Sequence, residues 1–223
     1  MIRIFLFDRR LLQEDTPIDF GKAETERISA IRNPTRRDES LAALTALSEL
    51  IRISFGDVNL EILRDKNGKP YFKNSDISFS LSHSGDISVA ALCDEKYNLI
   101  GVDVEKIADR ANIEELSQRF FSSDEKQEFI KRGKAQKAFF DIWTKKEAYA
   151  KMTGEGLASV LGDQAHHGSK NAESICYEFY NNSDIYSLSL CCSSKIKNVE
   201  FYNNSSNIKI KSHRTKGVKN DGF

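Results

Sequence analysis

Apolar and polar residues alternate along many short stretches of the chain, a pattern typical of β-strands that bury one face. Such stretches occur in both halves of the chain, over residues 2–7, 77–82, 87–93, 99–105, 175–180, 185–192, 199–202 and 207–211. Residues 58–62 also alternate and predict a strand before the turn Asp65-Lys66-Asn67-Gly68. Pro70 cannot donate a backbone hydrogen bond, so the segment after this turn should not be a central strand.

Helical spacing marks other segments. Apolar residues recur every three or four positions from Leu41 to Ile51, which predicts a core-packing helix. This helix should begin at Asn33-Pro34, because Asn caps helices and Pro suits their first turn. A second long helix is predicted over residues 136–152, with Gly154 as its C-cap. Shorter helices are predicted over residues 25–31, over 112–120 and after the capping box Ser122-Ser123-Asp124-Glu125.

The composition argues against several classes of partner. The chain has 223 residues, and its 33 Lys+Arg balance its 33 Asp+Glu, so no net charge attracts nucleic acid or an anionic membrane. The 4 cysteines lack the spacing of metal ligands, which favours a reduced state. Residues 1–7 are too short and too alternating for a signal peptide, and no apolar run could span a bilayer. We therefore expect a soluble cytoplasmic protein that binds neither nucleic acid nor membranes.

Two acids stand at the end of the strand predicted over residues 99–105. Asp103 and Glu105 project from one face of this strand, whereas Ile100, Val102 and Val104 project from the other. Gly101 shares the acidic face and leaves room beside it. Two close carboxylates repel each other, and a hard cation such as Mg²⁺ relieves the repulsion. The alternative is an edge strand whose polar face meets water, and an isolated D-x-E favours that interpretation.

The helix over residues 136–152 carries a second polar group of residues. Trp143, Glu147 and Lys151 are spaced four apart and therefore share a helical face. In one interpretation Glu147 and Lys151 form an ordinary ion pair on the surface. In the other, Glu147 is a third carboxylate facing Asp103 and Glu105, and Lys151 meets a phosphate held by the metal.

Three further residues have both a structural and a functional interpretation. His83 follows Ser82 at a strand end, where it is either a hydrogen-bonded loop residue or a donor to a phosphate oxygen. Lys69 is either exposed or a cation that reaches a phosphate. Glu125 is the third residue of a capping box, so a role as a base competes with its bond to the Ser122 amide.

Five motifs in one order resemble those of the Sfp-type 4′-phosphopantetheinyl transferases. They lie between residues 68 and 157 and are Gly68-Lys69-Pro70, Leu81-Ser82-His83-Ser84, Gly101-Val102-Asp103-Val104-Glu105, Arg119-Phe120-Phe121-Ser122 with Glu125, and Trp143 to Lys151 followed by Gly154-Glu155-Gly156-Leu157. Any one of these motifs is weak evidence, whereas their shared order and spacing are specific.

The resemblance implies an α+β fold of two similar halves related by a pseudo-twofold axis, each with a small antiparallel sheet and a long helix. Residues 1–98 would form the half on the nucleotide side of coenzyme A. Residues 99–211 would form the half with the metal and catalytic motifs, and residues 212–223 a frayed basic tail. The length matches the long form of the family, which works as a monomer.

The resemblance also implies an activity. Such an enzyme transfers the 4′-phosphopantetheine arm of coenzyme A to a serine of an apo acyl or peptidyl carrier protein and releases 3′,5′-ADP. Mg²⁺, or alternatively Mn²⁺, binds the diphosphate of coenzyme A.

The roles of individual residues follow from motif position. Asp103, Glu105 and Glu147 would be the metal ligands, and Lys151 would contact the phosphate and stabilise developing charge. Ser82 and His83 would bind the phosphates of coenzyme A, and Lys69 would bind its nucleotide. The serine proton would pass to Glu105, Glu125 or a metal-bound water.

The N-terminal half departs from the family pattern where basic residues bind the 3′-phosphate of coenzyme A. Arg27 matches one such position, but Glu24 and Glu39 stand at two others. Basic residues that could substitute are Lys22, Arg32, Arg36 and Arg37. Two other functions stay open, namely an Mg²⁺-dependent phosphoesterase acting on a diphosphate and a non-catalytic relative that binds coenzyme A or a carrier. The complete acidic set with Lys151 favours the transferase. The carrier protein and its pathway are not encoded in these residues.

Overall fold

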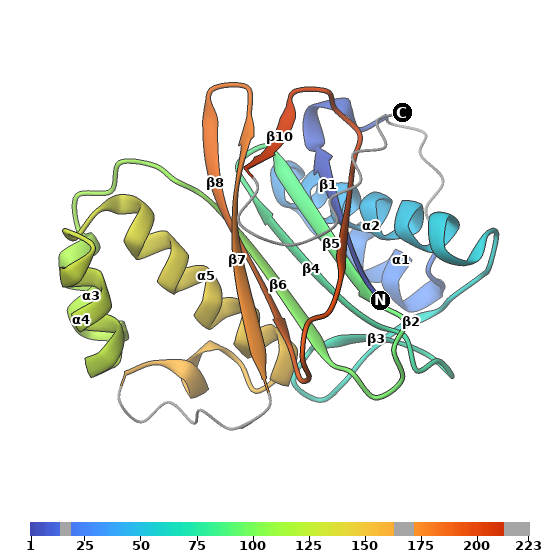
Figure 1. Cartoon of the computed structure of the whole chain (residues 1–223). Coiled ribbons are helices and arrows are strands. Elements are labelled where there is room, and N and C mark those ends of the chain that lie inside the picture. Colours follow the sequence, from blue (N-terminus) through green and yellow to red (C-terminus); the bar gives the residue numbers. More distant parts are fainter. Residues whose placement is uncertain (14–18, 163–171, 212–223) are drawn as a thin grey trace.

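The computed structural model describes residues 1–13, 19–162 and 172–211. Two sheets stack face to face at its centre, and helices cover their outer faces (Figure 1). The strands are β1 (Ile2–Asp8), β2 (Ile62–Arg64), β3 (Pro70–Phe72), β4 (Ser78–Ser84), β5 (Ile87–Cys93), β6 (Ile100–Lys106), β7 (Glu173–Asn181), β8 (Asp184–Cys192), β9 (Val199–Asn203) and β10 (Ile208–Lys211). The α-helices are α1 (Lys22–Ser29), α2 (Pro34–Phe55), α3 (Ile113–Phe120), α4 (Ser123–Lys131) and α5 (Gln136–Thr153), and the 3-10 helices are η1 (Arg9–Leu11) and η2 (Leu157–Val160).

Sheet topology confirms an α+β fold and corrects one expectation. The first sheet has the strand order β4-β5-β1-β9 and the second the order β10-β7-β8-β6, while β2 and β3 form a small hairpin. The second sheet is antiparallel throughout. In the first sheet β1, β5 and β4 pair antiparallel as predicted, but β9 departs from the prediction because it runs parallel to β1. Alternating hydrophobicity predicts a strand but contains no information on the direction of its partner.

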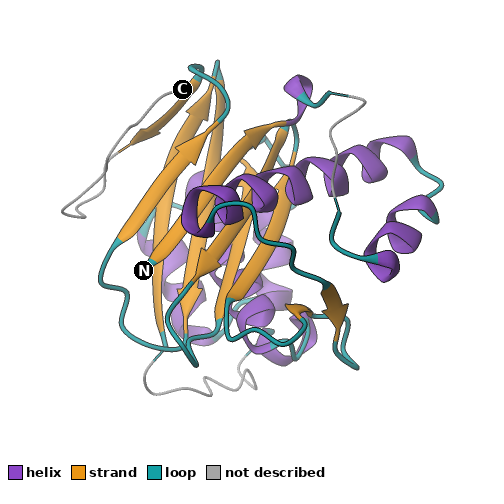
Figure 2. Ribbon diagram, turned by 90° about the vertical axis from the view of Figure 1, so that its right-hand side faces the viewer, coloured by secondary structure: helices purple, strands orange, loops and turns teal. Residues whose placement is uncertain are grey.

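The main core lies between the two sheets. Its side chains come from β1 and β5 to β10, and Ile4, Val89, Val102 and Leu188 are fully buried there. A second core lies between the outer face of the first sheet and α2, which runs across the strands (Figure 2). A third cluster joins α3, α4 and α5. Both long helices are therefore fixed by packing on a sheet.

Most of the predicted elements are confirmed, including both long helices. The Asn33 side chain accepts a hydrogen bond from the Arg36 amide at the start of α2, and Gly154 ends α5 in the left-handed conformation. The strand expected over residues 58–62 was placed wrongly, because β2 begins only at Ile62. Its partner β3 has 3 residues, so no further strand is available to pair with Val58. The tail predicted over residues 212–223 lies outside the described residues.

Two further observations bear on the chemistry of the chain. All 4 cysteines carry free thiols, in agreement with the reduced state expected from the sequence. No helix within the described residues is both long and apolar enough to cross a bilayer.

Candidate active site

A cleft of about 560 Å³ opens beside β4, β6 and the C-terminal half of α5. It brings together nearly all of the residues that the sequence singled out, namely Arg27, Lys69, Ser82, His83, Asp103, Glu105, Glu147 and Lys151. The acids lie on β6 and α5, whereas Arg27, Lys69, Ser82 and His83 come from earlier in the chain, so the cleft depends on contacts between distant segments. Glu125 is not among its lining residues.

The acidic face of β6 is covered by α5. An atom added at the Cβ position of Gly101 would lie 1.9 Å from the Ala148 carbonyl oxygen, so the absence of a side chain allows the helix to approach. Asp103 is only 2% exposed. The polar face of β6 therefore does not meet water as the alternative expected, although β6 does lie at the edge of its sheet.

Lys151 is paired with an acid on another element. Its Nζ atom donates hydrogen bonds of 2.8 Å to Asp103 Oδ1 and of 2.8 Å to Ser82 Oγ. The Ser82 hydroxyl in turn donates to Asp103 Oδ1 over 2.8 Å. Lys151 therefore does not form the surface ion pair with Glu147 that the alternative interpretation expected. Lys151 instead links α5 to β4 and β6.

The acids of the cleft influence one another. Burial, the charge of Asp103 and that of Glu105 raise the pKa of Glu147 to about 7, with Lys151 opposing the shift. Burial and the Asp103 charge also raise the pKa of Glu105. Such carboxylates gain from a nearby cation, because it removes both the repulsion and part of the desolvation cost.

The acids suit a hard divalent cation in their chemistry. Asp103 Oδ2 is buried and has no hydrogen-bond partner, while Glu105 uses only Oε2, as acceptor from Ser84 Oγ over 2.8 Å. Free carboxylate oxygens in one cleft are the donors that Mg²⁺ prefers. Within the described residues, no three Asp, Glu, His or Cys side chains lie close enough together to hold one metal ion in their present positions.

Another part of the cleft wall, which we call its basic end, carries two arginines and a lysine. Arg27 and Arg64 both line it, and both donate to the same carboxylate, that of Glu24. The bonds to Glu24 Oε1 measure 2.7 Å from Arg27 Nη2 and 3.2 Å from Arg64 Nη2. Lys69 lies in the same wall, where its Nζ donates to the Met152 carbonyl oxygen and burial lowers its pKa.

Sequence reasoning missed Arg64. No local signal distinguishes this residue from other arginines, since its partner Glu24 lies 40 residues away. The paired charges also explain how an acid can be buried at position 24. Lys69 also faces Asp65, so with Arg27, Arg64 and Lys69 charged the basic end keeps a net charge of +1 after Glu24 and Asp65 are counted (3 − 2).

His83 on β4 also lines the cleft. Its Nδ1 atom is 3.5 Å from Glu39 Oε2. Burial lowers the pKa of His83, and the Glu39 charge opposes that shift. The acid at position 39 is therefore placed to orient His83.

The carboxylate of Glu125 is bound by groups that stabilise the fold. Its carboxylate accepts the Ser122 amide over 2.7 Å and so completes the capping box of α4. Lys146 Nζ, itself buried, binds both of its oxygens at 2.7 and 2.9 Å. This pair ties α4 to the turn of α5 that carries Glu147.

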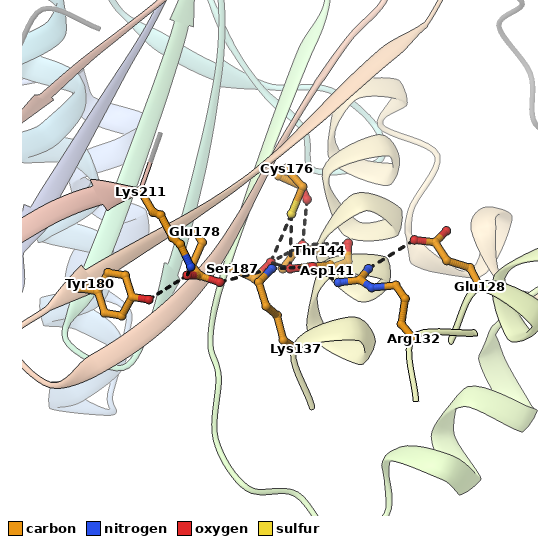
Figure 3. A network of polar contacts seen from close by, with 11 residues as sticks. Glu128, Arg132, Lys137, Asp141, Thr144, Cys176, Glu178, Tyr180, Ser187 and Lys211 are labelled. Carbon is orange, nitrogen blue, oxygen red and sulfur yellow. Dashed lines mark hydrogen bonds and ion pairs between the residues drawn. The ribbon is translucent and has the colours of Figure 1, made fainter. Parts of the chain in front are cut away.

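A polar network anchors the other half of α5 to the second sheet (Figure 3). The buried Asp141 accepts hydrogen bonds from Arg132 at 2.5 Å, Lys137 at 2.7 Å and Ser187 at 2.7 Å. Burial alone would raise the pKa of Asp141, but Lys137, Arg132 and Ser187 outweigh it and hold the pKa below its usual value. The network fixes the helix on which Glu147 and Lys151 depend.

Comparison with known proteins shows which family this part of the chain resembles. A model of the 4′-phosphopantetheinyl transferase superfamily matches residues 99–201, a span that includes Asp103, Glu105, Glu147 and Lys151. Among curated relatives, the 4′-phosphopantetheinyl transferase psf-1 of Bacillus pumilus is 40% identical over 100 residues, which are 43% of this chain and 40% of that protein. The 4′-phosphopantetheinyl transferase HetI of a Nostoc species is 38% identical over 103 residues, 43% of this chain and 42% of that protein.

A further relative covers somewhat more of the chain. The 4′-phosphopantetheinyl transferase AcpT of Escherichia coli is 35% identical over 113 residues, or 49% of this chain and 57% of that protein. The chain thus spans between 40% and 57% of the length of these three relatives. The family model and these relatives assign the segment that contains the acids and the lysine of the cleft to the 4′-phosphopantetheinyl transferase superfamily.

Proposed function

We propose that this protein transfers the 4′-phosphopantetheine arm of coenzyme A to a serine hydroxyl of an apo carrier protein. The observation that carries the proposal is the convergence of Asp103, Glu105, Glu147 and Lys151 in one cleft. In the reaction the serine oxygen forms a bond to the phosphorus that bears the pantetheine arm. The bond from that phosphorus to the leaving 3′,5′-ADP breaks.

The carboxylates of Asp103, Glu105 and Glu147 would hold an Mg²⁺ ion, or Mn²⁺ in its place. Bound there, the ion would neutralise charge on the diphosphate of coenzyme A. Lys151 would place its ammonium group beside the reacting phosphoryl group and stabilise the charge that develops on it. Its bond to Asp103 supports this role, because a lysine fixed at both Asp103 and Ser82 is already oriented.

The serine proton needs an acceptor, and Glu105 is the proposed one. Ser84 occupies Oε2 of Glu105, which leaves Oε1 to take a proton. Glu125 was the other carboxylate considered from the sequence. Its oxygens are bound by Lys146 and the Ser122 amide, so we propose a structural role for it instead.

Coenzyme A would lie along the cleft with its nucleotide at the basic end. Ser82, His83 and Lys69 would bind its phosphates and nucleotide, as the sequence predicts. We add Arg64 to Arg27 as a ligand of the 3′-phosphate. A phosphomonoester carries a charge close to −2 at neutral pH, which the net positive charge of this end attracts.

We further propose that the two halves are structural repeats related by a pseudo-twofold axis, residues 1–98 and 99–211. The order of elements supports this, because β1-α2-β4-β5 matches β6-α5-β7-β8 and the sheets contain the orders β4-β5-β1 and β7-β8-β6. The strand β9 would then be an addition that joins the second half to the first sheet.

The register of the two sheets indicates why only one half would carry acids. Ile2 pairs with Cys93 as Ile100 pairs with Cys192, so Asp103 corresponds in position to Phe5 and Glu105 to Phe7. Phe5 and Phe7 pack in the core beneath α2. One copy of the repeat would thus supply the metal ligands and the other the basic wall, within a single cytoplasmic chain that acts as a monomer.

The test is a reaction of the protein with coenzyme A, Mg²⁺ and an apo acyl or peptidyl carrier protein, followed by mass spectrometry of the carrier. Addition of one phosphopantetheine group supports the proposal. Release of free phosphopantetheine without a carrier would indicate a phosphoesterase. Binding of coenzyme A without any change of several carriers would indicate a non-catalytic relative.

A further inference from the structure

A row of serines joins the two sheets. The strands β4 and β6 lie side by side but belong to different sheets, so no backbone ladder connects them (Figure 1). Four hydroxyls of β4 replace it by accepting hydrogen bonds from amides of β6. The bonds run from Ile100 to Ser78 (3.2 Å), Val102 to Ser80 (3.0 Å), Val104 to Ser82 (3.3 Å) and Lys106 to Ser84 (3.0 Å). We call these four serines the serine ladder.

The serine ladder satisfies the free edge of β6. Alternate amides of an edge strand point away from its own sheet and need acceptors elsewhere. Serines at every second position of β4 face that edge together. A serine hydroxyl that accepts an amide still has its own proton to donate. The acceptor of that proton distinguishes the two ends of the ladder.

At one end the hydroxyl protons go to the acids of the cleft. Ser82 donates to Asp103 Oδ1 and Ser84 donates to Glu105 Oε2, each over 2.8 Å. At the other end, Ser78 and Ser80 donate to no carboxylate in the described part of the chain. The ladder thus contacts the acids of the cleft through Ser82 and Ser84 at one end only, within the described residues.

Ser84 differs from Ser82 in its relation to the cleft. Ser82 lines the cleft and accepts from Lys151, whereas Ser84 is not a lining residue. Ser84 therefore reaches the site only through Glu105. With Oε2 held by Ser84, the carboxylate of Glu105 keeps one orientation relative to the cleft. Without this bond the side chain gains rotamer freedom, which binding would have to remove.

We propose that Ser84 is a positioning residue, which fixes Glu105 for metal binding and so couples the junction between the sheets to the geometry of the site. The inference rests on the proposed function, in which Glu105 is a metal ligand. It assigns to Ser84 a role in metal affinity that a purely structural serine would not have. Outer groups that orient metal ligands commonly change affinity by about tenfold or more.

Ser78 provides a matched control. Ser78→Ala and Ser84→Ala each remove one hydroxyl and leave one β6 amide without its acceptor, so a similar loss of thermal stability is expected for both. Mn²⁺ affinity, measured by the electron paramagnetic resonance of the free ion, should separate them. We expect Ser84→Ala to weaken Mn²⁺ binding about tenfold and Ser78→Ala to leave it close to the wild type. Ser84→Thr retains a hydroxyl and should restore most of the affinity.

Equal Mn²⁺ affinities of Ser84→Ala and Ser78→Ala would overturn the proposal. A wild-type chain that binds no Mn²⁺ would overturn both the positioning role and the metal assignment. The proposed function alone would fail if the wild type binds Mn²⁺ and Ser84→Ala weakens this binding, yet no carrier protein gains the phosphopantetheine arm.

Discussion

Lys151 Nζ lies 2.8 Å from Asp103 Oδ1 and so connects the C-terminal half of α5 to the centre of β6. The two residues are 48 positions apart in the sequence. The contact places an ammonium group at the point where the acids of the cleft converge. It also gives the buried Asp103 the cation that such a carboxylate needs. The same lysine therefore serves the fold and the proposed chemistry.

Replacing Lys151 should separate these two roles. Lys151→Met removes the charge beside the reacting phosphoryl group, so we expect kcat for transfer to fall about a hundredfold or more. Lys145→Met is the matched control on the same helix, since Lys145 does not line the cleft. Steady-state kinetics with a carrier protein give both values. A Lys151→Met variant as active as Lys145→Met would contradict the role assigned to this lysine.

Gly101→Ala tests the close approach of α5 to β6. The added methyl group would meet the Ala148 carbonyl oxygen at 1.9 Å and the Met152 nitrogen at 2.5 Å. Both contacts are with backbone, so the helix must move. We expect a loss of about 3 kcal/mol in the free energy of unfolding. This corresponds to a Tm lowered by about 6–12 °C for a chain of this size. Calorimetry measures the shift, and an unchanged Tm would show that α5 does not pack against β6 as described.

Arg64→Met tests the basic end of the cleft. Hydrogen bonds to charged groups contribute about 1.5–3 kcal/mol, so wild-type protein should prefer coenzyme A over 3′-dephospho-coenzyme A by at least about tenfold. Arg64→Met should lose most of this preference, because coenzyme A loses a contact that the dephospho form never makes. Glu24 keeps Arg27 as a partner in this variant.

The control for Arg64 is an arginine in an ordinary surface pair. Arg52 binds Glu49 over 2.7 Å on the exposed side of α2, away from the cleft. Arg52→Met should therefore retain the full preference, as calorimetric titration with both forms of the cofactor would show. If Arg64→Met retains it too, the 3′-phosphate binds elsewhere.

Asp141→Asn should alter how stability depends on pH. The folded-state pKa of Asp141 lies below its usual value, so the carboxylate stabilises the fold above the unfolded pKa of about 3.9. This contribution is lost as the pH falls through the lower, folded-state value. We expect Asp141→Asn to cost about 2 kcal/mol at neutral pH, and this difference from the wild type should shrink below pH of about 4.

Chemical denaturation at several pH values measures that difference. Asp57→Asn is a suitable control because Asp57 is exposed. Its stability curve should follow that of the wild type. A deficit of Asp141→Asn that stays constant down to strongly acidic pH would mean that the network in Figure 3 does not depend on the Asp141 charge.

Local patterns were sufficient to predict the elements that carry the site. The spacing of Glu147 and Lys151 along α5 and the alternation around Asp103 are short-range features, so the sequence reveals them directly. The direction of β9 and the serine ladder depend instead on which strands meet in space. The pairing of Arg64 with Glu24 depends in the same way on distant residues. Lys151 shows the limit of such local patterns. Its spacing from Glu147 suggests that these two residues form an ion pair, but in the folded chain Lys151 pairs with Asp103 instead.

The most direct test of the account is the mass of an apo carrier protein after reaction with coenzyme A and Mg²⁺, compared between the wild-type chain and Asp103→Ala. We predict that the wild type adds one phosphopantetheine group per carrier serine. Asp103→Ala, confirmed as folded by circular dichroism, should leave the carrier unmodified. Near-normal modification by Asp103→Ala, or none by the wild type with several acyl and peptidyl carriers, would contradict the proposal that this cleft transfers the arm of coenzyme A.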